Sequence, residues 1–280
     1  MKLKKLFALL LAALLLSSCM VVIAGAQEKL RYLVLGDSIG FGAGISNPQE
    51  ANYGRIVANT NGYDYRNDAV NGHRTSDLLR RLQESGVAAD VSWADIISIS
   101  IGGNNFLRGN MSQIIAEGLE GNYTRFDGIV TQFAADLEAI VARIRTLNPH
   151  AYLLLQTVYN PVPGGEVTTV YQEALNRLNG AMKAYAAAHP GEITIVDVET
   201  AFGADRSLIA FDGIHPNAAG NVVIARTVLG SLCDLGIGFN TEPVIVTPGR
   251  DWTPSGFTGI LAAIRDFFRR VINFFAGLFS

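Results

Sequence analysis

Short runs of consecutive apolar residues recur along the chain and predict the strands of a buried sheet. These runs are rich in β-branched side chains, and they occupy residues 32–36, 96–101, 152–158 and 193–198. Continuous apolar runs of this length are typical of parallel strands that helices cover on both faces. A further short strand is expected at residues 63–66.

Between these runs, apolar residues recur every three or four positions, as they do along one face of a helix. The predicted helices occupy residues 76–83, 126–147, 168–188 and 216–235. Alternating strands and helices predict an α/β fold, a three-layer α/β/α sandwich around a central parallel sheet. Ligands bind at the carboxyl ends of the strands in such sheets, so polar residues that directly follow a strand are candidate site residues.

A serine follows the first predicted strand in the sequence GDSIG, and a histidine lies far downstream in DGIHPN. A serine hydroxyl is a weak nucleophile until a positioned base removes its proton during attack. His215 can be that base for Ser38, and Asp212, three residues before the histidine, can orient the imidazole and stabilise the imidazolium. The sequence therefore predicts Ser38, Asp212 and His215 as catalytic residues.

Two polar turns between these motifs offer hydrogen-bond donors. GGNN at residues 102–105 follows the strand at residues 96–101, and an NG pair occupies residues 71–72. Acyl transfer needs donors at the place where the oxyanion of the tetrahedral intermediate develops, and backbone amides and an asparagine side chain suit that role. We expect these loops to converge on the serine and histidine.

The order GDSIG, NG, GGN and DGIHPN resembles the SGNH hydrolase superfamily, also called the GDSL esterases and lipases. The resemblance covers residues 29–235 and implies the flavodoxin-like α/β/α fold of these hydrolases. It gives the three candidate catalytic residues the roles stated above. It also implies an oxyanion hole made by the backbone N–H groups of Ser38 and Gly72 and by the side chain of Asn104. No cofactor is implied, and the sequence has no metal-ligand spacing.

The third motif departs from the pattern of the resemblance, which usually reads GGND, because Asn105 stands in the last position. The amide keeps hydrogen bonds and loses the charge. Since that aspartate is not one of the catalytic residues, the departure bears on electrostatics and substrate range, and not on the triad.

The segment that follows the third motif, residues 106–126, is longer than a tight connection and mixes apolar residues with glycines. Two hypotheses stay open for it. It forms one wall of an acyl pocket, or it is a surface helix whose apolar face packs on the core.

Other interpretations of the motifs fit less well. GDS alone is compatible with a strand-to-helix turn in which Ser38 caps the helix, but four motifs in order favour the catalytic interpretation. The glycines after the first strand match neither GxGxxG nor the P-loop. The serine lacks the GxSxG context of an α/β-hydrolase, and its acid and base lie three residues apart. His73 is an alternative base, with Asp68 as its nearby upstream acid.

The composition fits one catalytic domain with appendages. The chain has 280 residues, of which 49% are hydrophobic, and its net charge of -3 gives no sign of nucleic-acid binding. The two cysteines, Cys19 and Cys233, cannot form a disulfide framework.

The N-terminus has the layout of a bacterial secretory signal. Lysines are followed by an apolar run at residues 6–16 and by small residues, which predicts a signal peptide at residues 1–26 with cleavage after Ala26. Two alternatives stay open: LSSC resembles a lipobox that would leave a diacylated Cys19, and the apolar stretch is long enough for an uncleaved anchor. In each case we expect an extracytoplasmic protein, secreted or held at the cell surface.

The composition changes after the catalytic domain, which we assign to residues 29–237. Residues 238–256 contain three prolines and few helix formers, which predicts a linker. Residues 257–280 carry an apolar stripe at helical spacing, and this predicts an amphipathic helix. Its phenylalanine-rich face and arginine-rich opposite face fit the surface of an anionic membrane. Docking on the catalytic domain and self-association stay open as alternatives. The residues opposite the stripe are Arg265, Asp266, Arg269, Arg270 and Asn273.

Taken together, the motifs predict a serine esterase or lipase that hydrolyses a small-molecule or lipid carboxylic ester through an acyl-enzyme. A carbohydrate acetyl esterase acting on cell-wall or plant glycans is the first alternative. A surface binding protein that keeps the fold without catalysis is the second. The oligomeric state and the acyl length are not predicted.

Overall fold

The computed structural model describes residues 28–162 and 164–253. The signal peptide predicted at residues 1–26, the lipidation site at Cys19 and the amphipathic helix predicted at residues 257–280 lie outside these residues. They remain predictions. Within the described ranges, no helix is both long enough and apolar enough to cross a membrane.

A parallel sheet of five strands forms the middle layer, and its strand order is β2-β1-β3-β4-β5. The predicted α/β/α sandwich with a central parallel sheet is therefore confirmed, including the short strand expected near residues 63–66. The strands are β1 (Arg31–Gly36), β2 (Asp64–Asn67), β3 (Ile96–Ser100), β4 (Tyr152–Gln156) and β5 (Thr194–Val196).

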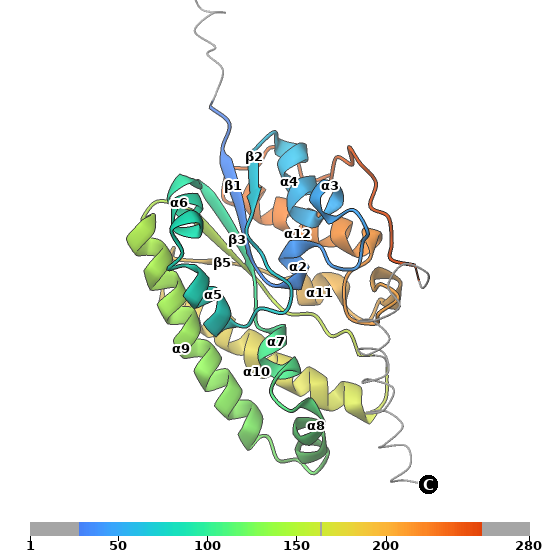
Figure 1. The fold of residues 1–280 in the computed structure, drawn as a ribbon. Coiled ribbons are helices and arrows are strands. Elements are labelled where there is room, and N and C mark those ends of the chain that lie inside the picture. Colours follow the sequence, from blue (N-terminus) through green and yellow to red (C-terminus); the bar gives the residue numbers. More distant parts are fainter. Residues whose placement is uncertain (1–27, 163, 254–280) are drawn as a thin grey trace, which may run out of the picture.

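Helices cover both faces of the sheet (Figure 1). Because successive side chains of a strand point to opposite faces, Leu33 and Leu35 belong to one core, whereas Tyr32 and Val34 belong to the other. On the first face lie α5 (Thr75–Arg81), α6 (Ser85–Trp93), α8 (Met111–Leu119), α9 (Thr124–Leu147) and α10 (Glu166–Ala188). On the second lie α4 (Tyr53–Asn61), α11 (Val198–Phe202) and α12 (Ala218–Asp234).

Short helices lie between these elements. They are α2 (Ser38–Phe41), α3 (Pro48–Ala51), α7 (Gly103–Leu107) and a 3-10 turn, η1 (Arg206–Leu208). Two of them, α2 and α7, carry residues of the first and third motifs. The last helix starts later than the predicted residue 216, because the side chain of Asn217 caps it by accepting a hydrogen bond from the N–H of Gly220 at 3.0 Å. Pro216 instead forms an isolated antiparallel bridge with Ile209.

The segment at residues 106–126 packs into the core. Phe106, Ile114 and Ile115 are buried, and they belong to the same apolar cluster as Phe126 and Val170. The hypothesis that this segment packs its apolar face on the core is confirmed. The pocket-wall hypothesis is wrong for these side chains, because the core already surrounds them.

The described part of the predicted linker, residues 238–253, runs back along the catalytic domain (Figure 1). The backbone N–H of Phe239 donates to Asn61 Oδ1 at 2.8 Å, and that of Val244 donates to Thr60 Oγ1 at 2.9 Å. The segment contains no helix and only an isolated bridge between Asp251 and Ile45. This described part thus lacks regular secondary structure and is hydrogen-bonded to the catalytic domain.

Candidate active site

Ser38 lies at the carboxyl end of β1, directly after a turn that only glycine can make. Gly36 has a φ of +118°, and a Cβ there would lie 1.9 Å from the carbonyl oxygen of Ser100. The side chain of Asp37 then caps α2 by accepting a hydrogen bond from the N–H of Ile39 at 3.0 Å. Ser38 is therefore the first residue of a short helix that starts at the edge of the sheet.

The carboxyl group of Asp37 is buried beneath this turn. It accepts a hydrogen bond from Ser100 Oγ at 3.2 Å, and Ser100 Oγ in turn accepts one from the N–H of Gly40 at 2.9 Å. Burial raises the pKa of Asp37 to about 6, although the hydrogen bonds from Ile39 N–H and Ser100 Oγ and the charge of His215 oppose the rise.

His215 connects the serine to an acid. Its Nε2 lies 2.9 Å from Ser38 Oγ, and its Nδ1 is hydrogen-bonded to Asp212 Oδ2. The other carboxylate oxygen, Asp212 Oδ1, accepts hydrogen bonds from the N–H groups of Ile214 at 2.9 Å and His215 at 3.0 Å. The three predicted catalytic residues are thus brought together, and the carboxylate is held by the loop that also carries the histidine.

The electrostatics of this loop favour an ionised Asp212. Burial acts to raise the pKa of Asp212, but the hydrogen bonds from His215 and from the backbone hold it below its usual value. An ionised acid accepts the Nδ1 proton of the imidazole, which leaves Nε2 free to accept the proton of Ser38 Oγ. This arrangement can therefore activate the serine for attack on a carbonyl.

Two of the predicted oxyanion donors, Gly72 and Asn104, lie on neighbouring segments of the chain. The backbone after β2 continues beside β1, since the N–H of Val70 donates to Gly36 O at 3.0 Å, and this places Gly72 just beyond the end of β1. Asn104, on α7, donates from Nδ2 to the carbonyl of His73 at 3.0 Å. An amide group carries two protons, so the second proton of Asn104 can be donated to a substrate. The third motif is therefore bonded to the residue that directly follows the second.

His73, the alternative base, does not make the contact with the serine. The atom hydrogen-bonded to Ser38 Oγ is His215 Nε2. Among the described residues, His73 Nδ1 is buried without a hydrogen-bond partner, and burial lowers the pKa of this histidine. His73 contributes its backbone carbonyl, which holds Asn104.

One site residue, Trp252, was not predicted. Its ring packs edge-on against the imidazole of His215, and its backbone N–H donates to Gly44 O at 3.1 Å. Gly44 lies against the chain after the histidine, because a Cβ there would be 2.0 Å from the carbonyl oxygen of Pro216. No local signal in the sequence connects Trp252 to the site, since the contact depends on how the chain returns after α12.

Residues 248–252, which we call the C-terminal clasp, hold Trp252 in this place. The clasp hydrogen-bonds both to the loop after Ser38 and to the start of the helix after His215. These bonds join Asn47 Nδ2 to Pro248 O at 3.1 Å, Arg250 N to Asn47 Oδ1 at 2.8 Å, Ser46 N to Arg250 O at 2.7 Å, and Ala218 N to Asp251 Oδ1 at 2.7 Å.

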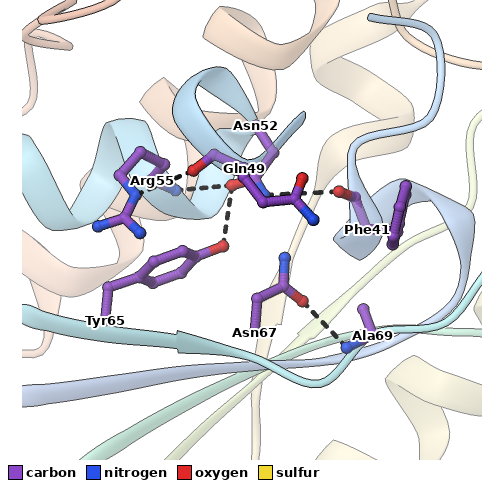
Figure 2. Close-up of a pocket in the computed structure, with 7 residues that line it drawn as sticks. All are labelled: Phe41, Gln49, Asn52, Arg55, Tyr65, Asn67 and Ala69. Carbon is purple, nitrogen blue, oxygen red and sulfur yellow. Dashed lines mark hydrogen bonds between the residues drawn. The ribbon is translucent and has the colours of Figure 1, made fainter. Parts of the chain in front are cut away.

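A cavity of about 250 Å³ lies beside α2 (Figure 2). Two of its polar side chains bond to other lining residues or to the backbone: Tyr65 Oη donates to Asn52 Oδ1 at 2.9 Å, and Asn67 Nδ2 donates to Gly40 O at 2.9 Å. These bonds join α4 and β2 to the helix that begins at Ser38. The lining residues are Phe41, Gln49, Asn52, Arg55, Tyr65, Asn67 and Ala69.

Within residues 28–162 and 164–253, no group of three or more histidine, cysteine or acidic side chains is placed to hold a metal ion. Cys233 is a free thiol on α12, partly exposed.

Comparisons with known proteins bear on the family and the fold of this chain. The uncharacterized protein YpmR of Bacillus subtilis (strain 168) is 29% identical to the chain over 221 residues, which are 72% of this chain and 81% of that protein. The fold is similar to that of the lipase Lip_vut3 from a goat rumen metagenome, with a TM-score of 0.60 and 22% identity over 76% of this chain and 100% of that one. It is also similar to phospholipase A1 from Streptomyces albidoflavus NA297, with a TM-score of 0.58 and 21% identity over 72% and 99% of the two chains.

The sequence also matches the GDSL-like Lipase/Acylhydrolase family over residues 34–223, well over half of the chain. The matched region includes all four motifs and ends before the C-terminal clasp. The chain therefore belongs to the GDSL-like lipase/acylhydrolase family of SGNH hydrolases.

Proposed function

We propose that this protein is a serine carboxylic ester hydrolase that acts on lipid or short acyl esters through an acyl-enzyme. The observation that carries the proposal is the distance of 2.9 Å between His215 Nε2 and Ser38 Oγ, with the buried carboxylate of Asp212 on the other ring nitrogen. A nucleophile, a base and an orienting acid in this order are the requirement for acyl transfer at a serine.

In the first half-reaction, Ser38 Oγ attacks the acyl carbonyl while His215 takes its proton. The N–H of Ser38 belongs to the first turn of α2, where a helix has no internal acceptor for it, so it is available to the oxyanion. The N–H of Gly72 and the side chain of Asn104 are the other donors in the proposal. His215 then protonates the leaving alcohol, and the acyl group remains on the serine.

In the second half-reaction, His215 removes a proton from water, and the hydroxide attacks the acyl carbonyl. The same donors hold the second oxyanion, and collapse of the intermediate returns the proton to Ser38 and releases the acid. The cycle needs no redox or electrophilic group beyond these residues.

Apolar surface near the site supports a substrate with an apolar part. Phe211, next to Asp212 in the chain, has 46% of its surface exposed. An exposed aromatic side chain beside the catalytic acid can contact an apolar part of a substrate. The lipase and phospholipase A1 with similar folds agree with this choice of substrate class.

We further propose that the protein works outside the cytoplasm and at a membrane surface. The predicted signal peptide at residues 1–26 supports export, either with cleavage after Ala26 or with lipidation of Cys19. The predicted amphipathic helix at residues 257–280 supports contact with anionic lipid. A lipid ester would then be taken from the interface that the helix binds.

The test compares the chain from Gln27 to Ser280 with its Ser38→Ala variant on p-nitrophenyl acetate, butyrate and palmitate and on a phospholipid. Ser92→Ala, which changes an exposed serine on α6, is the matched control. We expect hydrolysis by the parent and control proteins and none above background by Ser38→Ala. Equal activity in all three would contradict the serine mechanism. Release of acetate only from acetylated glycans would favour a carbohydrate esterase, and no hydrolysis of any ester would favour a binding protein.

A further inference from the structure

Two consecutive asparagines of α7 hold residues 72–75, the segment that begins with the proposed oxyanion donor Gly72. Asn104 bonds the carbonyl of His73, as described above. Asn105 bonds Thr75 twice, because its Oδ1 accepts from the N–H of Thr75 at 3.2 Å and its Nδ2 donates to Thr75 Oγ1 at 2.8 Å. His73, which directly follows Gly72, and Thr75 are therefore both hydrogen-bonded to α7.

A buried carboxylate completes this arrangement from another helix. Thr75 Oγ1 donates to Asp136 Oδ2 at 2.5 Å, and Gln132 Nε2 donates to Asp136 Oδ1 at 2.9 Å. Thr75 has no exposed surface and Asp136 has only 8%, so water does not compete strongly for these bonds. The chain of hydrogen bonds thus ties α7, the start of α5 and α9 together behind the oxyanion donors.

The direction of this chain is determined by the side chains at its two ends. A threonine hydroxyl has one proton to donate and two lone pairs that accept. The amide of Asn105 donates to Thr75, so the hydroxyl proton is free to go to Asp136. A carboxylate at position 105 would leave two acids facing one hydroxyl proton, so one carboxylate oxygen beside Thr75 Oγ1 would be buried without a donor.

We propose that Asp136 is a positioning residue for the oxyanion hole, and that it acts through the directed chain from Asn105 to Thr75 to Asp136. The amide at position 105 and the carboxylate at position 136 form a matched pair. The carboxyl group that the third motif lacks is thus supplied from α9. This inference rests on the proposed ester hydrolysis, since the residues that it positions are the proposed oxyanion donors.

The test exchanges the amide and the carboxylate at the two ends of this hydrogen-bond chain, at positions 105 and 136. Asn105→Asp alone places two carboxylates on one hydroxyl, and we expect kcat for p-nitrophenyl butyrate to fall about 10- to 100-fold, less than or similar to the loss of one oxyanion donor. KM should change by less than about threefold, because the ground state makes little use of these donors. The double variant Asn105→Asp with Asp136→Asn reverses the direction of the chain, and kcat should return to within about threefold of the parent value.

Two further variants test the role of the hydroxyl group of Thr75. Thr75→Val keeps the shape of the side chain and removes the link, so kcat should fall as in Asn105→Asp. Thr75→Ser keeps the hydroxyl and should retain most of the parent kcat. All rates are normalised to folded active sites, counted by covalent labelling of Ser38 with a fluorophosphonate. A purely structural role would shift the midpoint of thermal unfolding and leave kcat per labelled site unchanged.

The proposal would be overturned if kcat of Asn105→Asp equals that of the parent protein. It would also be overturned if kcat of the double variant is no higher than that of Asn105→Asp. If Asn105→Asp does not fold, the double variant decides, because recovery of kcat supports the directed chain and its absence contradicts it. Failure of the proposed function looks different, since the parent protein would then show no hydrolysis that Ser38→Ala removes.

Discussion

The indole ring of Trp252 packs edge-on against the imidazole of His215, with ring centroids 5.7 Å apart and planes inclined at 74°. The two residues lie far apart in sequence, and Trp252 falls outside the region of the family match at residues 34–223. The C-terminal clasp holds the tryptophan by hydrogen bonds to the loops that follow both Ser38 and His215. The site of this protein therefore contains an element that its family motifs do not include.

We predict that Trp252→Ala lowers kcat/KM for ester hydrolysis by about 2- to 10-fold, because an edge-on aromatic pair contributes about 0.5–1.5 kcal/mol. Trp252→Phe keeps an aromatic ring and should retain most of the activity. Trp93→Phe, on α6, provides the control for replacing a tryptophan away from the site. An unchanged kcat/KM in Trp252→Ala would show that the ring contact has no role in the reaction.

Two glycines provide a matched pair that tests the close packing of the loop after Ser38 against Pro216. Gly44 has a φ of +108° and no room for a Cβ, whereas Gly180 lies within α10, where an added Cβ would meet nothing within 4 Å. Gly44→Ala should lower the free energy of unfolding by about 2 kcal/mol or more and reduce activity, since the loop after Ser38 must move. Gly180→Ala should raise the free energy by about 0.5–1 kcal/mol through helix propensity.

Urea denaturation of the two variants beside the parent protein measures both effects. Equal stability of the Gly44→Ala and Gly180→Ala proteins would contradict the close approach of the loop to Pro216.

The buried carboxyl of Asp37 predicts a pH dependence of stability. Its pKa is raised to about 6 from 3.8 by burial, so the folded state binds its proton more tightly than the unfolded state does. The resulting stabilisation is complete below the unfolded pKa and is lost as the pH rises through about 6. Asp37→Asn has no charge to bury, so it should gain stability relative to the parent protein as the pH rises.

Urea unfolding of both proteins at about pH 4 and pH 8 tests this. The difference between their free energies of unfolding should change by roughly 2–3 kcal/mol in favour of Asp37→Asn at the higher pH, at about 1.4 kcal/mol for each pKa unit. A difference that stays constant with pH would mean that Asp37 is charged in the folded state without penalty.

The predicted amphipathic helix at residues 257–280 should hold the protein on anionic lipid. Deletion of these residues is expected to abolish sedimentation with vesicles that contain phosphatidylglycerol, because both the apolar stripe and the arginines are lost. Vesicles of phosphatidylcholine alone are the control for the charge. Unchanged binding by the deleted protein would contradict the membrane proposal, and a change in molecular mass in solution would favour self-association.

The motif residues could be predicted because each relationship among them is local or follows from strand order. Asp212 and His215 are separated by two residues, and the loop between them is short enough to bond the carboxylate to its own backbone. Ser38 and Asn104 each follow a buried strand, and the carboxyl ends of parallel strands meet at one edge of the sheet. Hydrophobic periodicity was sufficient for the strands and the long helices for the same reason, since it depends only on neighbours in the chain.

The tertiary structure alone decided which distant residues complete the site. The bond from Thr75 to Asp136 and the contact of Trp252 with His215 depend on packing between elements far apart in sequence. Periodicity likewise does not distinguish a pocket wall from a core helix, and Ile115 proved to be buried. The sequence by itself determined the fold class and the order of the motifs. Long-range packing decided what surrounds them, because it depends on side-chain shape and hydrogen-bond direction across the whole domain.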